Sequence, residues 1–317
     1  CAGVWTDDVG QMLVKNQPKD PWKHWLAPSR GLHLVFDWKS IPIPGAVVMQ
    51  HPEDGRISFV IPRKDFGQGV TIVGTTDGPC SLPPDLIEEE TKAIEVDTHY
   101  LVDLLKEYFP DLNLSHDDIV SHYIGIRPLV DPKRGASDSK GGGNLQKVSR
   151  EHTIDHGPGG SVIVAGGKYT TFRKMAEEIV DFTVRDVKQW KHLEPNTHEP
   201  LFEPALATSI SGVREHARAR GYEISEKLFE RYGADALEIY DIYQKHCDKT
   251  VEDPDGFPML EAQFRYAVRH QMVLNVEDFV RRRQPLYLCR KDHGSPWLNT
   301  LQKALENETK SDILHKQ

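Results

Sequence analysis

The stretch VIVAGGKYTTFRKMAEEIVD, residues 162–181, constrains the fold more than any other part of the sequence. Its apolar, β-branched start at 162–164 predicts a buried strand. Gly166 and Gly167 allow a sharp turn, because no Cβ stands in the way, and Thr170 and Thr171 are candidate N-caps of a helix. In that helix, side chains suited to packing on a sheet recur at helical spacing: Phe172, Met175, Ala176, Ile179 and Thr183.

A strand, a glycine turn and a helix N-terminus together present backbone N–H groups and the positive end of a helix dipole. An anionic or electron-rich group fits such a place, with Lys168 beside it. The alternative is an ordinary turn with a capped helix and a solvated lysine, since glycine turns are common in α/β folds. The stretch by itself leaves both interpretations open.

Composition and charge argue against several classes of protein. The 317 residues, 38% hydrophobic and 27% charged, are typical of a globular chain with room for two domains. A net charge of −9 without a long basic run argues against nucleic acid as a partner. The 4 cysteines form no CxxC pair and the 15 histidines no HExxH pair, so we expect no metal site, no disulfide framework and a reducing compartment. No apolar run is long enough to span a bilayer.

The chain changes character near residue 200. Before that point, short β-rich runs separated by Pro, Gly and Asp predict an antiparallel sheet, at 32–38, 46–50, 56–62 and 70–76. A helix is expected at 86–109, with Leu101, Leu104, Leu105 and Tyr108 on one face, followed by a strand that ends at Pro128. The polar, glycine-rich segment 131–147 predicts a mobile surface loop. After a linker marked by Pro195, Pro200 and Pro204, helical patterns run to the end, at 226–233, 236–247, 260–273 and 276–288.

Two arginines stand at the ends of predicted strands. Arg127 comes directly before a proline, which holds it in an extended conformation, and Arg150 follows the polar loop. Together with Lys168 they would suit a phosphate or carboxylate, because guanidinium forks and an ammonium point charge both bind such anions. For each arginine alone, the alternative is an ordinary salt bridge to a neighbouring carboxylate.

Four motifs carry a resemblance to a known family. GTTD at 74–77, GIRPLV at 125–130, SREH at 149–152 and AGGKYTTFRKMAE at 165–177 occur in the order seen in FAD-dependent glycerol-3-phosphate dehydrogenases, members of the D-amino-acid oxidase-like flavoprotein group. AGVWTDD at 2–8 resembles a late stretch of that family's flavin domain. Residues 261–288 resemble its helical C-terminal domain, so the resemblance runs from about residue 2 to about residue 290.

This resemblance implies an α+β fold, in which part of an FAD-binding domain and an antiparallel substrate domain precede an all-α C-terminal domain. The implied parts are a residual FAD-domain segment at 1–30, a substrate-binding β-rich domain at 31–155, the final strand and helix of the FAD domain at 156–192, and the helical domain at 205–317. The GxGxxG fingerprint with which the family opens does not occur in this chain. We therefore expect a fragment that is inactive alone, whose strands near residues 1–10 and 160–166 lack sheet neighbours and leave apolar surface exposed.

The family's chemistry assigns roles to particular residues. It implies oxidation of sn-glycerol 3-phosphate to dihydroxyacetone phosphate, with FAD as cofactor and quinone as electron acceptor. Cofactor contacts would come from Ala2, Gly3, Gly166, Gly167, Lys168, Tyr169, Thr170 and Thr171. The substrate would be bound by Arg127, Arg150 and Lys168, with His33 and Arg127 as the catalytic residues. His33 would be the general base, since an imidazole with a pKa of about 6.5 suits proton removal at neutral pH; the alternative is a structural strand histidine bonded to a backbone carbonyl.

Other interpretations stay open at this point. An oxidase of the same architecture would pass electrons to oxygen, and a chain without its dinucleotide fold could be a non-catalytic interaction module. The resemblance implies peripheral membrane association, at the mitochondrial inner membrane in a eukaryote or at the cytoplasmic face of the membrane in a bacterium. The basic cluster Arg281, Arg282 and Arg283 suits either acidic lipids or a solvated helix end.

Overall fold

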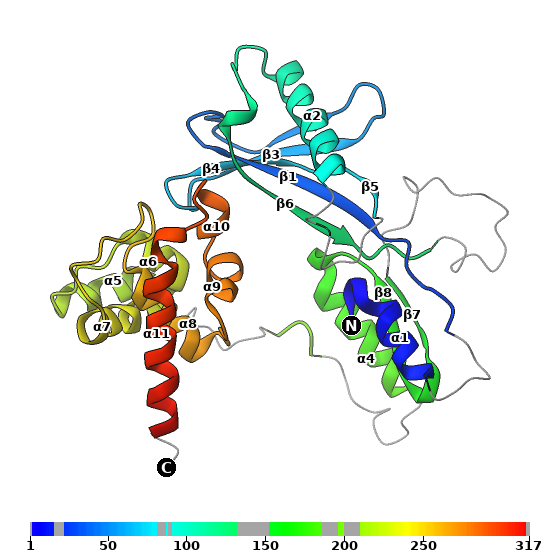
Figure 1. Ribbon diagram of the computed structural model, residues 1–317. Coiled ribbons are helices and arrows are strands. Elements are labelled where there is room, and N and C mark those ends of the chain that lie inside the picture. The colour runs from blue at the N-terminus through cyan, green and yellow to red at the C-terminus, as the bar shows by residue number, and fades with distance from the viewer. Residues whose placement is uncertain are drawn as a thin grey trace. The chain divides into compact units, whose positions relative to one another are not determined.

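The computed structural model describes residues 2–15, 22–80, 87, 91–131, 152–185, 196–199 and 210–314. Its antiparallel sheet and its many helices confirm the predicted α+β class (Figure 1). The contacts divide the chain into two compact units: the first is Cys1–Leu32, Thr76–Glu95 and Ile124–Leu201, and the second is His33–Thr75, Val96–Tyr123 and Phe202–Gln317. The four domain boundaries expected from the sequence stay predictions. The segment 132–151 and the linker prolines lie outside the described residues.

The main sheet is antiparallel, as predicted. Its strands are β1 (Ser29–Asp37), β2 (Val47–Gln50), β3 (Ile57–Arg63), β4 (Val70–Gly74), β5 (Gly78–Pro79) and β6 (Ile119–Arg127). They run in the order β2-β3-β4-β1-β5, and β6 also pairs with β1. The boundary between the two units falls inside β1 and β6, so β2, β3 and β4 belong wholly to the second unit.

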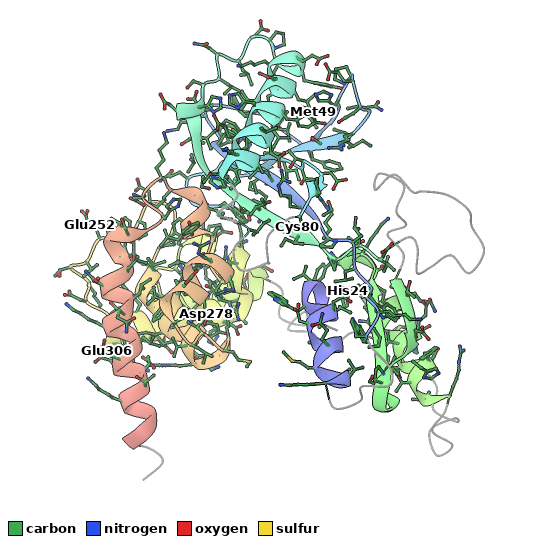
Figure 2. The ribbon with its side chains drawn as sticks, turned by 45° about the vertical axis from the view of Figure 1, so that its right-hand side comes forward. His24, Met49, Cys80, Glu252, Asp278 and Glu306 are labelled. Carbon is green, nitrogen blue, oxygen red and sulfur yellow. The ribbon has the colours of Figure 1, made fainter. Side chains whose placement is uncertain are left out.

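Helix α2 (Thr91–Tyr108) lies along the sheet (Figure 1). Its residues Leu101, Leu104 and Leu105 are buried, as is Met49 of β2 (Figure 2). Tyr108 lies on the same face, as predicted, although it is 42% exposed at the end of the helix. Its hydroxyl donates to the carbonyl of Gln50 at 3.0 Å and accepts from the N–H of Gln50 at 2.9 Å, which ties the helix end to the edge strand.

The helical part of the second unit follows residue 209. Its elements are α5 (Ile210–Ala219), α6 (Glu226–Tyr232), the 3₁₀ turn η9 (Gly233–Asp235), α7 (Ala236–His246), α8 (Leu260–His270), α9 (Val276–Arg282), α10 (Leu286–Cys289) and α11 (Ser295–Leu314). The helical pattern expected at 276–288 is two helices, since Pro285 cannot donate a helical hydrogen bond and stands at the start of α10. Asn275 and Asp278 form a capping box at the start of α9. Within the described residues, no helix is long and apolar enough to cross a bilayer.

The second face of the sheet packs against these helices. Val35, Val70 and Ile72 form a buried cluster that Phe66, Tyr123 and Cys289 cover. The hydroxyl of Ser121 on β6 donates to the carbonyl of Leu288 on α10 at 2.7 Å. α2 therefore lies along one face of the sheet of the second unit, and α10 packs on the β1, β4 and β6 part of the other face, where Phe59 and Ile61 of β3 are exposed.

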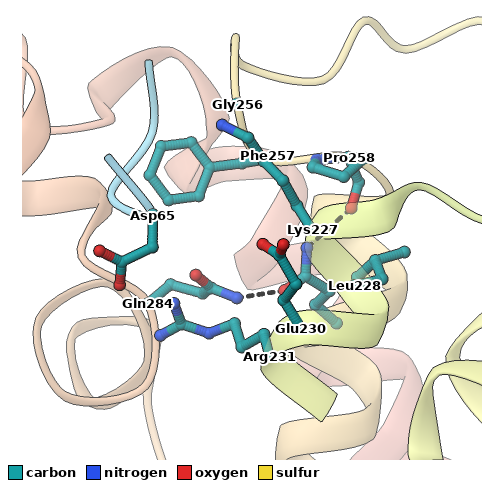
Figure 3. A pocket seen from close by; sticks show the side chains of 10 residues that line it. Asp65, Lys227, Leu228, Glu230, Arg231, Gly256, Phe257, Pro258 and Gln284 are labelled. Atoms are coloured by element: carbon teal, nitrogen blue, oxygen red, sulfur yellow. Dashed lines mark hydrogen bonds between the residues drawn. The ribbon is translucent and has the colours of Figure 1, made fainter. Parts of the chain in front are cut away.

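A second contact joins the β3–β4 turn to the helices. The backbones of Gly67 and Gly256 touch, and the Lys227 ammonium donates to the carbonyl of Gly67. Beside this contact lies a cavity of about 100 Å³ whose lining includes Gln263 and Gln284 (Figure 3). Both glutamines are buried, and the amide of Gln284 donates to the side-chain oxygen of Gln263. The turn is thus embedded in the helical part through backbone contacts that leave no room for side chains.

Gly256→Ala is expected to lower the free energy of unfolding by about 2–5 kcal/mol. A Cβ at this position would lie 2.2 Å from the carbonyl group of Gly67, and such overpacking costs about 1–3 kcal/mol. The φ of Gly256 is +81°, which adds about 1–2 kcal/mol for a residue with a Cβ. Gly221→Ala is the matched control, because Gly221 has a φ of +69° but open space around its Cβ position. Urea unfolding of both variants separates the two effects; equal losses would show that the Gly67 contact does not matter.

The N-terminal residues of the first unit are helical. The sequence suggested strands near residues 1–10, and this is wrong: the 3₁₀ turn η1 (Gly3–Trp5) leads into α1 (Thr6–Val14). The Thr6 hydroxyl donates to the carbonyl of Gly3 at 2.7 Å, and Asp7 stands in the first turn, where a negative charge favours a helix. Asp7 also accepts from the indole of Trp22 at 2.9 Å and from the N–H of Trp25 at 2.7 Å. Burial alone would raise the pKa of Asp7, but these hydrogen bonds outweigh it and the pKa lies below its usual value.

The rest of the described first unit is a two-stranded sheet with one helix. β7 (His152–His156) pairs with β8 (Val162–Gly166) around the 3₁₀ turn η5 (Pro158–Gly160), and the 3₁₀ turn η6 (Tyr169–Thr171) leads into α4 (Phe172–Val184) (Figure 1). α4 contacts β7. The predicted packing face of α4 holds in part: Met175 and Ile179 are half-buried, whereas Phe172, 45% exposed, Ala176 and Thr183 are exposed.

Apolar side chains of the first unit are exposed, as predicted. On α1 and the residue before it, the exposed side chains are Trp5, Val9, Met12 and Leu13, which fall on one helix face. On η6 and α4 they are Tyr169, Phe172 and Val180. Within the described residues β8 has β7 as its strand neighbour. The first unit therefore presents two apolar helix faces, one on α1 and one on α4.

Candidate cofactor and substrate site

The glycine turn after β8 has the predicted geometry. Gly166 and Gly167 have φ values of +76° and +92°, which favour glycine. A Cβ on Gly167 would lie 2.4 Å from the terminal methyl of Met175, so this glycine also lets α4 approach the strand end. Strand, turn and helix follow one another as the sequence indicated.

The turn leaves backbone donors for a ligand. Lys168, Tyr169, Thr170 and Thr171 are all exposed, Tyr169 by 89%. Thr171 stands at the predicted N-cap position, yet its hydroxyl and its N–H both donate to the carbonyl of Lys168, at 3.0 and 3.1 Å, and it makes no side-chain cap. Across the described part of the chain, the backbone N–H groups of Lys168, Tyr169 and Thr170 donate to no protein acceptor. They lie at the N-terminus of the 13-residue α4, where an anionic or electron-rich group is favoured.

The guanidinium of Arg127 is held by strand ends of the same unit. Its Nη1 donates to Asp77 at 3.1 Å, to the hydroxyl of Ser29 at 3.3 Å and to the carbonyl of Arg30 at 3.2 Å. Its Nη2 donates to the carbonyl of Thr76 at 3.1 Å. Asp77 and Arg127 are 50 residues apart in sequence, and each belongs to one of the motifs GTTD and GIRPLV. The salt bridge weighed as the alternative for Arg127 therefore exists, and it fixes the orientation of the guanidinium fork.

His33 lies in the middle of the sheet. It is half-buried on β1, opposite Gly74 of β4 in the strand register. Its ring stacks on that of Tyr123, with centroids 4.6 Å apart and planes at 5°. The Nδ1 atom of His33 is buried.

The structure distributes the predicted site residues as follows. The second unit contains His33. The first unit contains Arg127, Lys168, the glycine turn with Thr170 and Thr171, and Ala2 and Gly3, which are the N-cap and the first residue of η1. Arg150 lies outside the described residues. The catalytic and binding roles assigned to these residues stay predictions. The residues that sequence reasoning missed are Asp77 and Tyr123: both lie within or next to quoted motifs, but nothing in the sequence pairs them with Arg127 or His33.

Comparison with known proteins identifies the family. The family model described as FAD dependent oxidoreductase matches residues 1–171. The chain belongs to this family. A second family model, described as the C-terminal domain of alpha-glycerophosphate oxidase, matches residues 207–313. FAD is the cofactor of the family, and the exposed donors at the glycine turn fit a group of that kind.

Similar proteins carry related names. The chain is 31% identical over 311 residues to the aerobic glycerol-3-phosphate dehydrogenase of Staphylococcus aureus (strain USA300), an alignment that covers 92% of this chain and 50% of that protein. It is 30% identical over 297 residues to the aerobic glycerol-3-phosphate dehydrogenase of Staphylococcus haemolyticus, covering 89% and 49%. The chain thus spans about half the length of these curated relatives.

A solved structure supports the fold. The glycerol-3-phosphate dehydrogenase from Bacillus halodurans, complexed with FAD, superposes with a TM-score of 0.65 and 22% sequence identity. The match covers 99% of this chain and 60% of that one. At this level of identity it shows a shared fold, and with the two family models it confirms the resemblance found in the sequence.

Proposed function

We propose that this chain is part of an FAD-dependent glycerol-3-phosphate dehydrogenase, which oxidises sn-glycerol 3-phosphate to dihydroxyacetone phosphate. The observation that carries the proposal is the turn at residues 166–171, with two glycines at positive φ and exposed N–H groups at the start of α4. The names of the staphylococcal relatives support glycerol 3-phosphate as the substrate.

When bound, FAD supplies the hydride acceptor for such a reaction. The N–H groups at Lys168 and Tyr169 and the positive end of α4 would stabilise negative charge at the electron-rich edge of a bound flavin. Arg127, Arg150 and Lys168 would bind the substrate phosphate and oxygens, since forked and point cations bind phosphate. His33 would take the proton of the substrate hydroxyl as general base.

The surface of the first unit supports the view that this chain is one part of a larger enzyme. The apolar faces of α1 and α4 are exposed, with Met12 at 71% and Val180 at 57%. Contiguous apolar faces of this kind are usually covered by other protein. The curated relatives are about twice as long as the matched region. We propose that further polypeptide covers these helices and supplies the pyrophosphate site of FAD.

The electron acceptor and the location form the finer part of the proposal. We propose quinone as acceptor, with peripheral attachment to a membrane, at the mitochondrial inner membrane in a eukaryote or the cytoplasmic face in a bacterium; the relatives named above are bacterial. Oxygen is the second candidate, because the C-terminal family model is described from an alpha-glycerophosphate oxidase. Oxygen uptake on addition of glycerol 3-phosphate would identify an oxidase, whereas reduction of a quinone without oxygen uptake would identify the dehydrogenase.

The chain alone is expected to purify without FAD and to show no oxidation of glycerol 3-phosphate. The pyrophosphate contacts of a dinucleotide are charge-assisted hydrogen bonds worth about 1.5–3 kcal/mol each. Losing two or three of them weakens binding by about 10²–10⁶-fold. Flavin absorbance and dye reduction with added FAD check this expectation. A yellow preparation with stoichiometric FAD would contradict the proposal of a partial enzyme.

A second arm tests the function itself. Dye reduction by glycerol 3-phosphate is expected in the FAD-loaded enzyme that contains this chain. Absence of turnover there would favour the remaining alternative, a non-catalytic interaction module.

A further inference from the structure

The ring of His33 on β1 lies next to residues of the two neighbouring strands, β4 and β6. In the strand register, Gly74 of β4 stands directly opposite His33 of β1, and β6, which carries Tyr123, also pairs with β1. The rings of His33 and Tyr123 are parallel within 5°, with centroids 4.6 Å apart, a distance typical of stacked rings. The imidazole therefore has an aromatic neighbour on one strand and a residue without a side chain on the other.

Gly74 leaves the space in which the imidazole lies. A Cβ at position 74 would stand 2.4 Å from Cδ2 of His33, 2.8 Å from Cγ and 3.1 Å from Nε2. The first two distances are shorter than the contacts that Cβ atoms make in proteins, so any side chain at this position would displace the ring. A glycine inside a strand weakens it, and its presence often marks such a close approach.

Tyr123 is itself fixed in place. It packs against the buried cluster of Val35, Val70 and Ile72. Burial raises the pKa of its phenol, although the positive charge of Arg63 acts in the opposite direction, so the ring stays neutral near pH 7. A neutral ring held by apolar contacts gives the imidazole a fixed surface on which to stack.

We propose that Tyr123 and Gly74 are positioning residues, which hold the imidazole of His33 in one orientation for proton removal. Tyr123 does this by stacking on the ring, and Gly74 by leaving room for it. The catalytic meaning of this arrangement rests on the proposed function, in which His33 is the general base. The orientation itself depends only on the geometry of the sheet.

The orientation can be tested on the chain itself by NMR of the histidine side chains. The His33 signals are assigned by their loss in His33→Gln, and a ring stacked on tyrosine shows ring-current shifts. Tyr123→Leu is expected to abolish these shifts, whereas Tyr123→Phe, which keeps an aromatic ring, is expected to retain them. Gly74→Ala should move the signals, and the matched control Gly45→Ala, with open space at its Cβ, should not. Unchanged His33 signals in folded Tyr123→Leu would overturn the proposal, even if Gly74→Ala fails to fold.

The consequence for catalysis is measured in the FAD-loaded enzyme that contains this chain. Because a displacement of about 1 Å can cost 10²-fold in rate, Tyr123→Leu is expected to lower kcat by about 10–100-fold with little change in KM. Tyr123→Phe is expected to restore kcat to near its original value. Shifted NMR signals together with an unchanged kcat would overturn the positioning role while leaving glycerol 3-phosphate oxidation in place. If the enzyme showed no such oxidation, the proposed function would fail, and the NMR result would still decide whether Tyr123 and Gly74 orient the ring.

Discussion

Arg127→Lys is expected to lower kcat/KM for glycerol 3-phosphate by about 10²–10⁴-fold in the FAD-loaded enzyme that contains this chain. The guanidinium uses both of its terminal nitrogens: Nη1 reaches Asp77 and Nη2 reaches the carbonyl of Thr76, both at 3.1 Å. A lysine ammonium is a single point and cannot reproduce this fork. The loss of two charge-assisted bonds to the substrate phosphate, at about 1.5–3 kcal/mol each, gives the stated range. Steady-state kinetics at varied substrate concentration measure it.

A matched control separates a substrate role from a structural one. Arg56→Lys changes an arginine that pairs with Asp54 at 3.4 Å in the turn between β2 and β3, and it should leave kcat/KM unchanged. If Arg127→Lys lowered only the melting temperature and kept normal kinetics, Arg127 would be a strand-end salt bridge and not a substrate ligand. Asp77→Asn adds a second test, because it loosens the guanidinium without removing it and should lower kcat/KM less than Arg127→Lys does.

Arg265→Ala is expected to lower the free energy of unfolding by about 3–5 kcal/mol, since removing one partner of a buried ion pair leaves an uncompensated charge. Arg265 is 6% exposed and bonds to Glu261 at 2.7 Å and to Glu308 at 2.8 Å. Glu308 is nearly as buried and also accepts from Arg269 at 2.7 Å. Helices α8 and α11 are therefore joined through shared carboxylates. Urea unfolding measures the loss.

The control for this variant is an exposed pair of the same kind. Arg282 bonds to Asp278 at 2.7 Å on α9, but its side chain is 58% exposed. Exposed pairs contribute about 0–1 kcal/mol, so Arg282→Ala should have a small effect. A comparable loss in both variants would show that burial does not strengthen the Arg265 network.

The same network predicts acid sensitivity. Burial alone would raise the pKa of Glu308, but the hydrogen bonds from Arg269 and Arg265 outweigh it and the pKa lies below its usual value. A carboxylate whose pKa is lower in the folded state stabilises the fold above the unfolded value of about 4.3 and loses that contribution as the pH falls further. The free energy of unfolding should therefore fall as the pH drops below about 4.3. In Glu308→Gln it should fall less steeply over the same pH range. An unchanged slope in that variant would contradict the assignment to Glu308.

Local patterns were enough to predict much of this protein. The β-branched run, the two glycines and the helical spacing at 162–184 predicted β8, the turn and α4, because each depends on neighbours a few residues away. The antiparallel strands and the C-terminal helices were predictable for the same reason. The motifs, read in order, also indicated the flavoprotein family that the family models confirm.

Tertiary structure decided what depends on distant residues. Residues near the N-terminus form α1 and not a strand, and the indole of Trp22 packs against Gly10 of that helix. Tyr108 lies on the predicted helix face, and its hydroxyl reaches the backbone of Gln50 on the edge strand. The contact between Tyr108 and Gln50 has no local signal, because the two residues are far apart in sequence, whereas α1 also has the local signal of Asp7 in its first turn.

The same distinction applies to the candidate site. The sequence indicated Arg127, His33 and the glycine turn one by one, from strand ends, glycines and motif resemblance. Strand pairing decided that Asp77 holds the guanidinium and that Tyr123 stacks on the imidazole above Gly74. Register sets these partners, and register is a property of the assembled sheet, in which a shift of one residue would turn each side chain to the opposite face.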